Sequence, residues 1–172
     1  MMTPKRLAYL LLKTARPRQW IKNFAIYAAL IFSGFFFYVP GSGIPYFWTV
    51  TYAFGIFCLL TSAVYIFNDV VDAAADAEHP FKRKRPIASG ELPIPIAIFT
   101  AVAILAAAFL LSFGLGSFFR MIILLYLGLQ IFYAKVLKHL PILDVISIAS
   151  GFLLRVYAGA VVVNLHMNVW FL

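Results

Sequence analysis

Long stretches without a charged side chain limit how this chain can fold. No Asp, Glu, Lys or Arg occurs between Lys22 and Asp69, between Glu91 and Arg120, or after Arg155. A helix needs about 20 apolar residues to cross the hydrocarbon core of a bilayer. These stretches have room for several such helices, so the sequence predicts an all-α, polytopic bundle of membrane-spanning helices.

The composition agrees with an integral membrane protein and argues against a nucleic-acid-binding protein or one built on disulfides. Of the 172 residues, 64% are hydrophobic and 12% are charged, and the formal net charge is +8. The basic residues lie at the ends of the apolar stretches, where phospholipids or phosphorylated substrates are the expected neighbours, so nucleic acid is not an expected partner. The single cysteine, Cys58, cannot form a disulfide within one chain or build a thiolate metal site.

Five spans are expected within a single membrane domain, residues 1–172. Residues 1–22 form a basic interfacial segment, in which residues 3–20 are amphipathic and direct Leu7, Leu10 and Leu11 inward. The predicted spans are residues 23–39, 46–67, 94–113, 117–133 and a fifth span that begins near Ile142.

The charges of the connecting segments predict the orientation of the bundle. The N-terminal segment and the loops at residues 68–91 and 134–141 are basic, whereas the turns at residues 40–45 and 114–116 carry no charge. By the positive-inside rule, the basic side is cytoplasmic. We therefore expect residues 68–91 to form a cytoplasmic loop.

Acidic residues are concentrated just after the second span. Four of the six acidic residues of the chain lie within residues 69–78. Residues 62–79 contain no Gly or Pro, so we expect the helix of the second span to continue through them. At 100° per residue, Asp69, Asp72 and Asp76 then form one column about two turns long.

A column of three carboxylates favours a metal ion. Like charges on one helix face repel each other unless a cation lies between them. Mg²⁺ prefers carboxylate oxygens and usually shares its coordination sphere with water and substrate phosphates. We therefore expect Asp69, Asp72 and Asp76 to bind Mg²⁺ and to be catalytic. The alternative is a solvated helix end, which has no need of three stacked aspartates.

Basic residues flank the apolar stretches on the same side. Lys82 to Arg85 are four consecutive basic residues directly after the acidic region. Arg16, Arg18 and Lys22 precede the first span, where they either set the topology or contact substrate. Lys22 and Asn23 are favoured as substrate contacts because they lie at the expected mouth of the bundle.

The fifth span contains Asp144 and Arg155. They are eleven residues apart, so they share a helix face to within about 20° and are about 16 Å apart along the axis. Ser147, Gly151 and Gly159 lie on or near that face and suit a bundle interior. Ionisable groups within a span indicate function. For Asp144 the alternative to a functional role is a structural one, because an acid in the first turn of a helix is favourable. Arg155 could bind a phosphate or neutralise a buried acid.

Several motifs resemble one protein family. Asn68-Asp69-x-x-Asp72-x-x-x-Asp76 resembles the first aspartate-rich motif of the UbiA superfamily of intramembrane prenyltransferases. Three further segments resemble its polyprenyl-phosphate (decaprenyl-phosphate) phosphoribosyltransferase branch. They are RPRQWIKN at residues 16–23, DAEHPFKRKRPIASG at residues 76–90, and LKHLPILD with SGFLLR at residues 137–144 and 150–155.

The resemblance implies a reaction and a set of site residues. The reaction is Mg²⁺-dependent transfer of 5-phosphoribosyl from phosphoribosyl pyrophosphate to a polyprenyl phosphate, with release of diphosphate. It belongs to the synthesis of a cell-envelope arabinan precursor or a related lipid-linked sugar. The resemblance also implies a protein of the bacterial inner (plasma) membrane, with residues 68–91 as its cytoplasmic active-site loop. Asn68 is implied to assist the three aspartates in holding Mg²⁺. The residues implied to bind substrate phosphates are Lys82, Arg83, Arg85 and Lys138.

Length separates this chain from the family it resembles. Family members are about twice as long and have roughly nine spans, so this chain resembles an N-terminal half, completed by a missing C-terminal half or by a homo-oligomer. Five helices alone are expected to leave the polar face of the fifth span towards lipid. Two other functions stay open: transfer of a polyprenyl group from its diphosphate to an aromatic acceptor, and a non-catalytic membrane subunit or inactive fragment.

Overall fold

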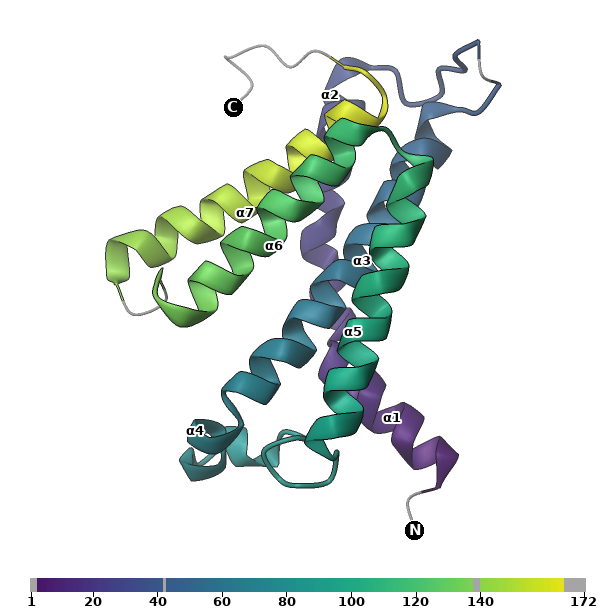
Figure 1. Ribbon diagram of the computed structural model, residues 1–172. Coiled ribbons are helices and arrows are strands. Elements are labelled where there is room, and N and C mark those ends of the chain that lie inside the picture. The colour runs from purple at the N-terminus through teal and green to yellow at the C-terminus, as the bar shows by residue number, and fades with distance from the viewer. Residues whose placement is uncertain (1–2, 42, 138–139, 166–172) are drawn as a thin grey trace. The chain divides into compact units, whose positions relative to one another are not determined.

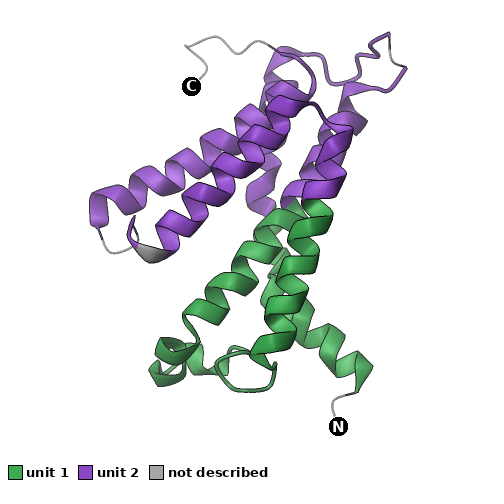
Figure 2. Cartoon of the chain, in the orientation of Figure 1, with its two compact units in different colours: residues 1–20, 58–108 green, residues 21–57, 109–172 purple. Residues whose placement is uncertain are grey.

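The computed structural model describes residues 3–41, 43–137 and 140–165, which form helices, turns and bends, with no strand among them (Figure 1). The chain divides into two compact units (Figure 2). Unit 1 contains residues 1–20 and 58–108, and unit 2 contains residues 21–57 and 109–172. The long helices α3 (Tyr46–Val71) and α5 (Ile94–Leu111) each contribute residues to both units.

Unit 1 begins with helix α1 (Pro4–Ala15), which confirms the amphipathic pattern of the N-terminal segment. The backbone N–H of Arg6 donates to Thr3 Oγ1 at 3.4 Å, so Thr3 caps the helix. Leu10 is buried, whereas Lys5 and Lys13 are exposed. The buried core that α1 joins consists of Leu10, Ala15, Ile66, Ile87, Leu92, Ala97 and Ala101.

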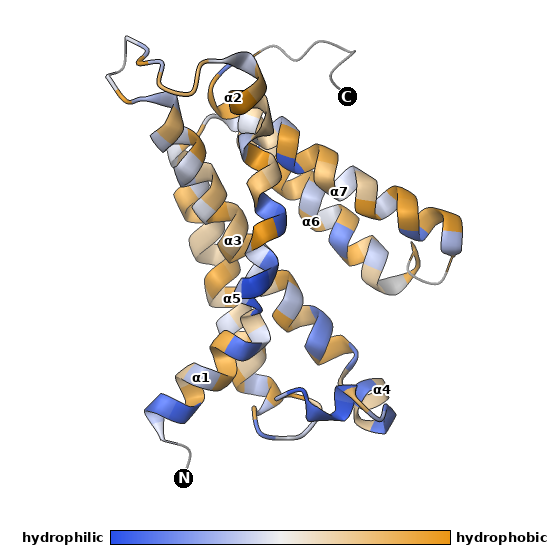
Figure 3. Cartoon of the chain, turned by 180° about the vertical axis from the view of Figure 1, so that it is seen from behind, coloured by the Kyte–Doolittle hydropathy of each residue, from blue (hydrophilic) through white to orange (hydrophobic). Residues whose placement is uncertain are grey.

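The hydropathy of unit 1 follows its structure. In Figure 3 the parts of α3 and α5 in this unit are mostly apolar, and hydrophilic residues gather on α4 (Ala73–Glu78) and the turn that follows it. Ala97 and Ala101 of α5 are fully buried in the core. Small side chains allow helices to approach closely, which explains why alanines occupy these positions.

Four helical stretches in the described part of the chain are long and apolar enough to cross a membrane. They are Tyr46–Val71, Ile94–Gly114, Ser117–Ala134 and Pro141–Val162. They correspond to the second to fifth predicted spans and confirm where those spans lie. The last two stretches lie in helices α6 (Ser117–Lys135) and α7 (Pro141–Val162).

The first predicted span, residues 23–39, is wrong at both ends. The chain instead forms a 3₁₀ helix, η1 (Pro17–Tyr27), followed by the short helix α2 (Ala28–Ser33). Gly34 ends α2 in a left-handed conformation with φ 74°, which glycine adopts without steric cost. A 3₁₀ helix rises about 2.0 Å per residue and an α-helix about 1.5 Å, so the summed length of η1 and α2 is about 30 Å. These helices begin at Pro17, before the first residue of the predicted span.

The predicted continuous helix through the aspartates is also corrected, because α3 ends at Val71 and α4 begins at Ala73. Asp72 lies between them with φ −86° and ψ 0°. Its backbone N–H still donates to the Asn68 carbonyl oxygen at 2.9 Å. The chain therefore bends at Asp72 without losing this hydrogen bond, and the bend agrees with repulsion along a column of like charges.

Unit 2 is built around α7, against which α6 and α2 pack. Phe57 contributes aromatic contacts to α6, with its ring centroid 6.0 Å from that of Phe119 and 5.5 Å from that of Tyr126. A Cβ added at Gly159 of α7 would lie 1.8 Å from the Ile26 carbonyl oxygen. Only glycine therefore permits this close backbone approach between α7 and η1.

The polar face of α7 is buried within unit 2. Five residues of this face are buried: Ser147, Gly151, Arg155, Ala158 and Gly159. The expectation that five helices would leave this face towards lipid is therefore wrong. The close contact with η1 and the packing of α6 cover it, because small side chains on α7 let both approach.

Candidate functional site

Two carboxylates and two arginines form the centre of the candidate site in unit 1. Asp69 and Asp76 are each 3% exposed. Arg85 Nη1 donates to Asp69 Oδ1 at 3.2 Å and also to Asp76 Oδ2. Arg16 Nη2 donates to the same Asp69 Oδ1. A single guanidinium nitrogen of Arg85 therefore bridges the two buried carboxylates, which compensates charges that burial alone would penalise.

Further basic and aromatic side chains surround this pair. Lys82 Nζ lies 3.9 Å from Asp76 Oδ1. The guanidinium carbon of Arg16 lies 5.2 Å from the ring centroid of Tyr65, a distance typical of a cation–π contact. The side chains of Arg16 and Arg85 are 30% and 28% exposed. Both cations are therefore accessible to an anion, although they already contact carboxylates.

A pocket of about 360 Å³ opens beside these ion pairs, and we call it the Asp69 pocket. Its lining residues are Lys13, Arg16, Asp69, Phe81, Lys82, Lys84, Arg85 and Pro86. Five of these side chains are basic and one is acidic. This charge suits a polyanion such as a diphosphate, which arginine can bind through two parallel hydrogen bonds.

The turn after α4 places the basic residues at this pocket. His79 Nδ1 accepts hydrogen bonds from the backbone N–H groups of Phe81 at 3.2 Å and Lys82 at 3.4 Å. One short 3₁₀ turn, η2 (Lys82–Lys84), follows, and the Arg85 N–H donates to the Lys82 carbonyl oxygen at 2.9 Å. His79 therefore acts in the structure by shaping this turn.

The structure separates the predicted site residues of this region into two groups. Asp69, Lys82 and Arg85 line the Asp69 pocket, and Asp76, which does not line it, contacts both Lys82 and Arg85. Asn68 and Asp72 are half-buried and Arg83 is exposed, and none of these three lines the Asp69 pocket.

The donor atoms at the pocket fit Mg²⁺ in part. Within residues 3–41, 43–137 and 140–165, no three His, Cys, Asp or Glu side chains are grouped closely enough to hold a metal ion. Asp69 and Asp76, however, share one cationic nitrogen of Arg85. Two carboxylates that converge on one cation are suitable ligands for a hard metal ion, which completes its coordination with water and substrate phosphate.

Three site residues were missed by the sequence reasoning: Lys13 and Lys84 as lining residues of the Asp69 pocket, and Arg16 as the partner of Asp69. The Arg16-Pro17-Arg18 sequence was identified as part of a motif but was equally compatible with a topological role. Arg16 takes a left-handed conformation, with φ 54° and ψ 60°, at the C-terminus of α1. Such a conformation is uncommon for a residue other than glycine and marks this junction for attention.

Unit 2 contains a second polar cluster, centred on Arg155 of α7. Its Nε donates to Asn23 Oδ1 at 2.9 Å, Nη1 to the Gly151 carbonyl oxygen at 2.8 Å, and Nη2 to the Tyr126 hydroxyl at 2.7 Å. Arg155 is 6% exposed, and Asn23 and Tyr126 are also buried. The observed partners of Arg155 are neutral, so it does not pair with a buried acid here.

The remaining predicted residues have separate surroundings. Lys22 is exposed on η1. Asp144 lies in the first turn of α7, as the structural alternative predicted, and its Oδ1 accepts a hydrogen bond from the Tyr133 hydroxyl at 2.8 Å. Lys138 lies outside the described residues.

Comparisons with known proteins identify relatives over nearly the whole chain. The model of the UbiA prenyltransferase family matches residues 20–172. Two relatives named decaprenyl-phosphate phosphoribosyltransferase are 38% identical, in Mycolicibacterium smegmatis, and 40% identical, in Corynebacterium glutamicum. A third with this name, in Mycobacterium tuberculosis, is 36% identical. Each match covers 98% of this chain, and 53%, 51% and 56% of the respective relative. The chain thus spans about half the length of the curated relatives it matches.

Proposed function

This chain belongs to the UbiA prenyltransferase family, and on that premise we propose that it takes part in phosphoribosyl transfer to a lipid. The donor is phosphoribosyl pyrophosphate, and the acceptor is a polyprenyl phosphate such as decaprenyl phosphate. The observation that carries the proposal is the name shared by relatives that are 36–40% identical over 98% of the chain. The basic side chains of the Asp69 pocket and the two buried carboxylates, Asp69 and Asp76, support it.

The carboxylates of the site are suited to hold the metal ion of such a reaction. The family is generally dependent on a divalent metal ion, and we propose Mg²⁺. Asp69 and Asp76 would be its main ligands. Asn68 and Asp72 lie near them in the sequence and would assist in holding the ion. When bound, Mg²⁺ supplies positive charge that stabilises the leaving diphosphate.

The basic residues bind and orient the phosphates. Arg16, Lys82 and Arg85 contact carboxylates in this structure and are accessible enough to bind diphosphate oxygens when the donor is present. In the transfer, an oxygen of the lipid phosphate forms a bond to the anomeric carbon while the bond from that carbon to diphosphate breaks. The attacking phosphate oxygen is already anionic, so the site needs no strong base.

The family and the charges of the chain support a location for the site. Four apolar helical stretches and family membership make this an integral membrane protein. The basic residues next to the Asp69 pocket favour the cytoplasmic side of a bacterial inner membrane, by the positive-inside rule. Phosphoribosyl pyrophosphate, a charged soluble donor, would reach the site from there.

Transfer of a prenyl group, with an aromatic compound as the acceptor, is the second candidate, because the family that matches is named for prenyl transfer. It would use the same carboxylates on an allylic diphosphate. The two candidates differ in the donor, so competition between phosphoribosyl pyrophosphate and an allylic diphosphate separates them. A non-catalytic subunit, in contrast, predicts that neither donor binds.

Label transfer tests the proposal. The chain is produced in membranes both alone and together with the C-terminal half of the Corynebacterium glutamicum relative, and is given labelled phosphoribosyl pyrophosphate, Mg²⁺ and decaprenyl phosphate. We expect lipid-soluble label in at least one of the two preparations. Asp76→Asn should reduce its rate about 100-fold, because a carboxylate that stabilises the departing charge is lost.

Glu78→Gln is the matched control for this experiment. Glu78 is an exposed acid two residues from Asp76, so its loss should leave the rate of transfer nearly unchanged. The proposal fails if neither preparation yields lipid-soluble label, or if Asp76→Asn transfers label as fast as Glu78→Gln.

A further inference from the structure

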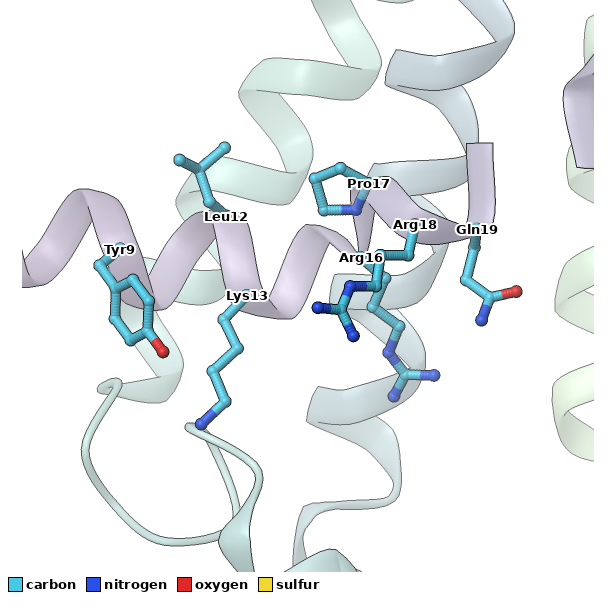
Figure 4. Close-up of a pocket in the computed structure, with 7 residues that line it drawn as sticks. All are labelled: Tyr9, Leu12, Lys13, Arg16, Pro17, Arg18 and Gln19. Carbon is cyan, nitrogen blue, oxygen red and sulfur yellow. The ribbon is translucent and has the colours of Figure 1, made fainter. Parts of the chain in front are cut away.

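A second pocket in unit 1 lies at the junction between α1 and η1. It has a volume of about 620 Å³, and we call it the Arg18 pocket. Its lining residues are Tyr9, Leu12, Lys13, Arg16, Pro17, Arg18 and Gln19 (Figure 4). In Figure 4, Lys13, Arg16 and Arg18 extend to the same side of this segment, and Leu12 extends to the opposite side.

The Arg18 pocket and the Asp69 pocket differ in charge. The Arg18 pocket has three basic side chains and no acidic one in its lining, whereas Asp69 lines the other pocket. A site without carboxylates does not attract a metal ion but does attract a phosphate. Lys13 and Arg16 line both pockets, so the two anion sites adjoin each other along these side chains.

The apolar residues of the Arg18 pocket indicate a lipid rather than a soluble anion. The aromatic side chain of Tyr9 is 63% exposed, and the aliphatic side chain of Leu12 is 59% exposed. Exposed aromatic and aliphatic groups next to basic residues are typical of positions at a membrane surface. A ligand with a phosphate head and a hydrocarbon chain satisfies both kinds of side chain.

We propose that the Arg18 pocket binds the phosphate monoester head group of the acceptor lipid, an assignment that rests on the proposed function. A phosphate monoester carries a charge between about −1.5 and −2 at neutral pH, more than a phosphodiester, and so benefits most from three cations. Arg16 and Arg18 can bind it with hydrogen-bond pairs, and Lys13 as a point charge. The lining residues shared with the Asp69 pocket place acceptor and donor phosphates in adjoining sites.

Binding of farnesyl phosphate, a short lipid phosphate monoester, tests the assignment. The purified chain in detergent micelles is titrated with farnesyl phosphate, with farnesol as the comparison that lacks phosphate and phosphatidylglycerol as the phosphodiester. Arg18→Gln is expected to weaken farnesyl phosphate binding about five- to tenfold, through loss of a charge-assisted hydrogen bond. Farnesol and phosphatidylglycerol should bind more weakly than farnesyl phosphate.

Lys5→Gln is the matched control, because Lys5 is an exposed cation of α1 that lines neither pocket. Equal effects of Arg18→Gln and Lys5→Gln, or equal binding of the monoester and the phosphodiester, would overturn the assignment in favour of general attraction to an anionic surface. Mg²⁺-dependent binding of diphosphate is measured in the same variants. If diphosphate binds normally but farnesyl phosphate binding does not depend on Arg18, this assignment fails and the proposed donor site does not.

Discussion

Arg85→Ala is expected to lower the free energy of unfolding by about 2–4 kcal/mol when no divalent cation is present. Removing one member of a buried ion pair typically costs 3–5 kcal/mol, because the remaining charge loses its compensation. Here two carboxylates, Asp69 and Asp76, lose the guanidinium that bridges them. The cost is reduced because Arg85 is 28% exposed and because Arg16 and Lys82 remain nearby.

Mg²⁺ should restore part of the stability that Arg85→Ala removes. If the two carboxylates can share a metal ion in place of the arginine, millimolar Mg²⁺ should raise the stability of Arg85→Ala more than that of the wild type, since ligand binding to the folded state stabilises it. Equilibrium unfolding in mixed detergent micelles, with and without Mg²⁺, measures both effects. Arg83→Ala is the control, because Arg83 is exposed in the same turn and lines no part of the Asp69 pocket.

An equal loss of stability in the two arginine variants would contradict the ion pairs described for Arg85. A loss confined to Arg85→Ala with no gain from Mg²⁺ would leave the ion pairs in place and contradict the metal site.

Arg155→Leu is expected to destabilise the protein by about 2–4 kcal/mol. The substitution removes the guanidinium that donates to Asn23 Oδ1, the Gly151 carbonyl oxygen and the Tyr126 hydroxyl oxygen. A hydrogen bond to a charged group contributes about 1.5–3 kcal/mol to stability, and hydrogen bonds between membrane helices average about 0.6 kcal/mol, so the loss of three bonds falls in this range.

A second substitution tests whether the network, and not the volume of the side chain, causes this loss. Tyr126→Phe removes one of the three hydrogen bonds that Arg155→Leu also removes, so the double variant should be less destabilised than the sum of the two single variants. Arg120→Leu is the control. Arg120 is half-buried, and its guanidinium carbon lies 4.8 Å from the ring centroid of Phe113, which is a cation–π contact. Loss of this contact should lower the free energy of unfolding by less than about 1 kcal/mol. Additive effects of Arg155→Leu and Tyr126→Phe would contradict the network.

The sequence predicted the long helices well, because their limits follow from local composition. Apolar stretches of membrane-spanning length, ended by Pro, Gly or charge, gave the second to fifth spans to within a few residues. The 3₁₀ helix η1 and the bend at Asp72 were not predicted. Neither the left-handed Arg16 before η1 nor the ion pairs on either side of Asp72 can be read from helix propensity.

The site was predictable where charge was conspicuous. Asp69, Asp76, Lys82 and Arg85 could be identified because charged residues are rare in this chain. Arg16 was missed as the partner of Asp69 because 53 positions separate them. Asn23 and Arg155 are 132 positions apart, and their contact depends on how closely α7 approaches η1, which sequence periodicity does not reveal.

We propose above all that Asp69 and Asp76 hold a divalent metal ion that binds the diphosphate of the donor. Calorimetric titration of the purified chain with diphosphate, with and without Mg²⁺, tests this claim most directly. We expect the wild type and Glu78→Gln to bind diphosphate with a clear requirement for Mg²⁺. Asp76→Asn should lose that requirement and bind diphosphate at least tenfold more weakly, a loss of about 1.4 kcal/mol. Diphosphate binding that is equally strong without Mg²⁺, or unchanged in Asp76→Asn, would contradict this claim.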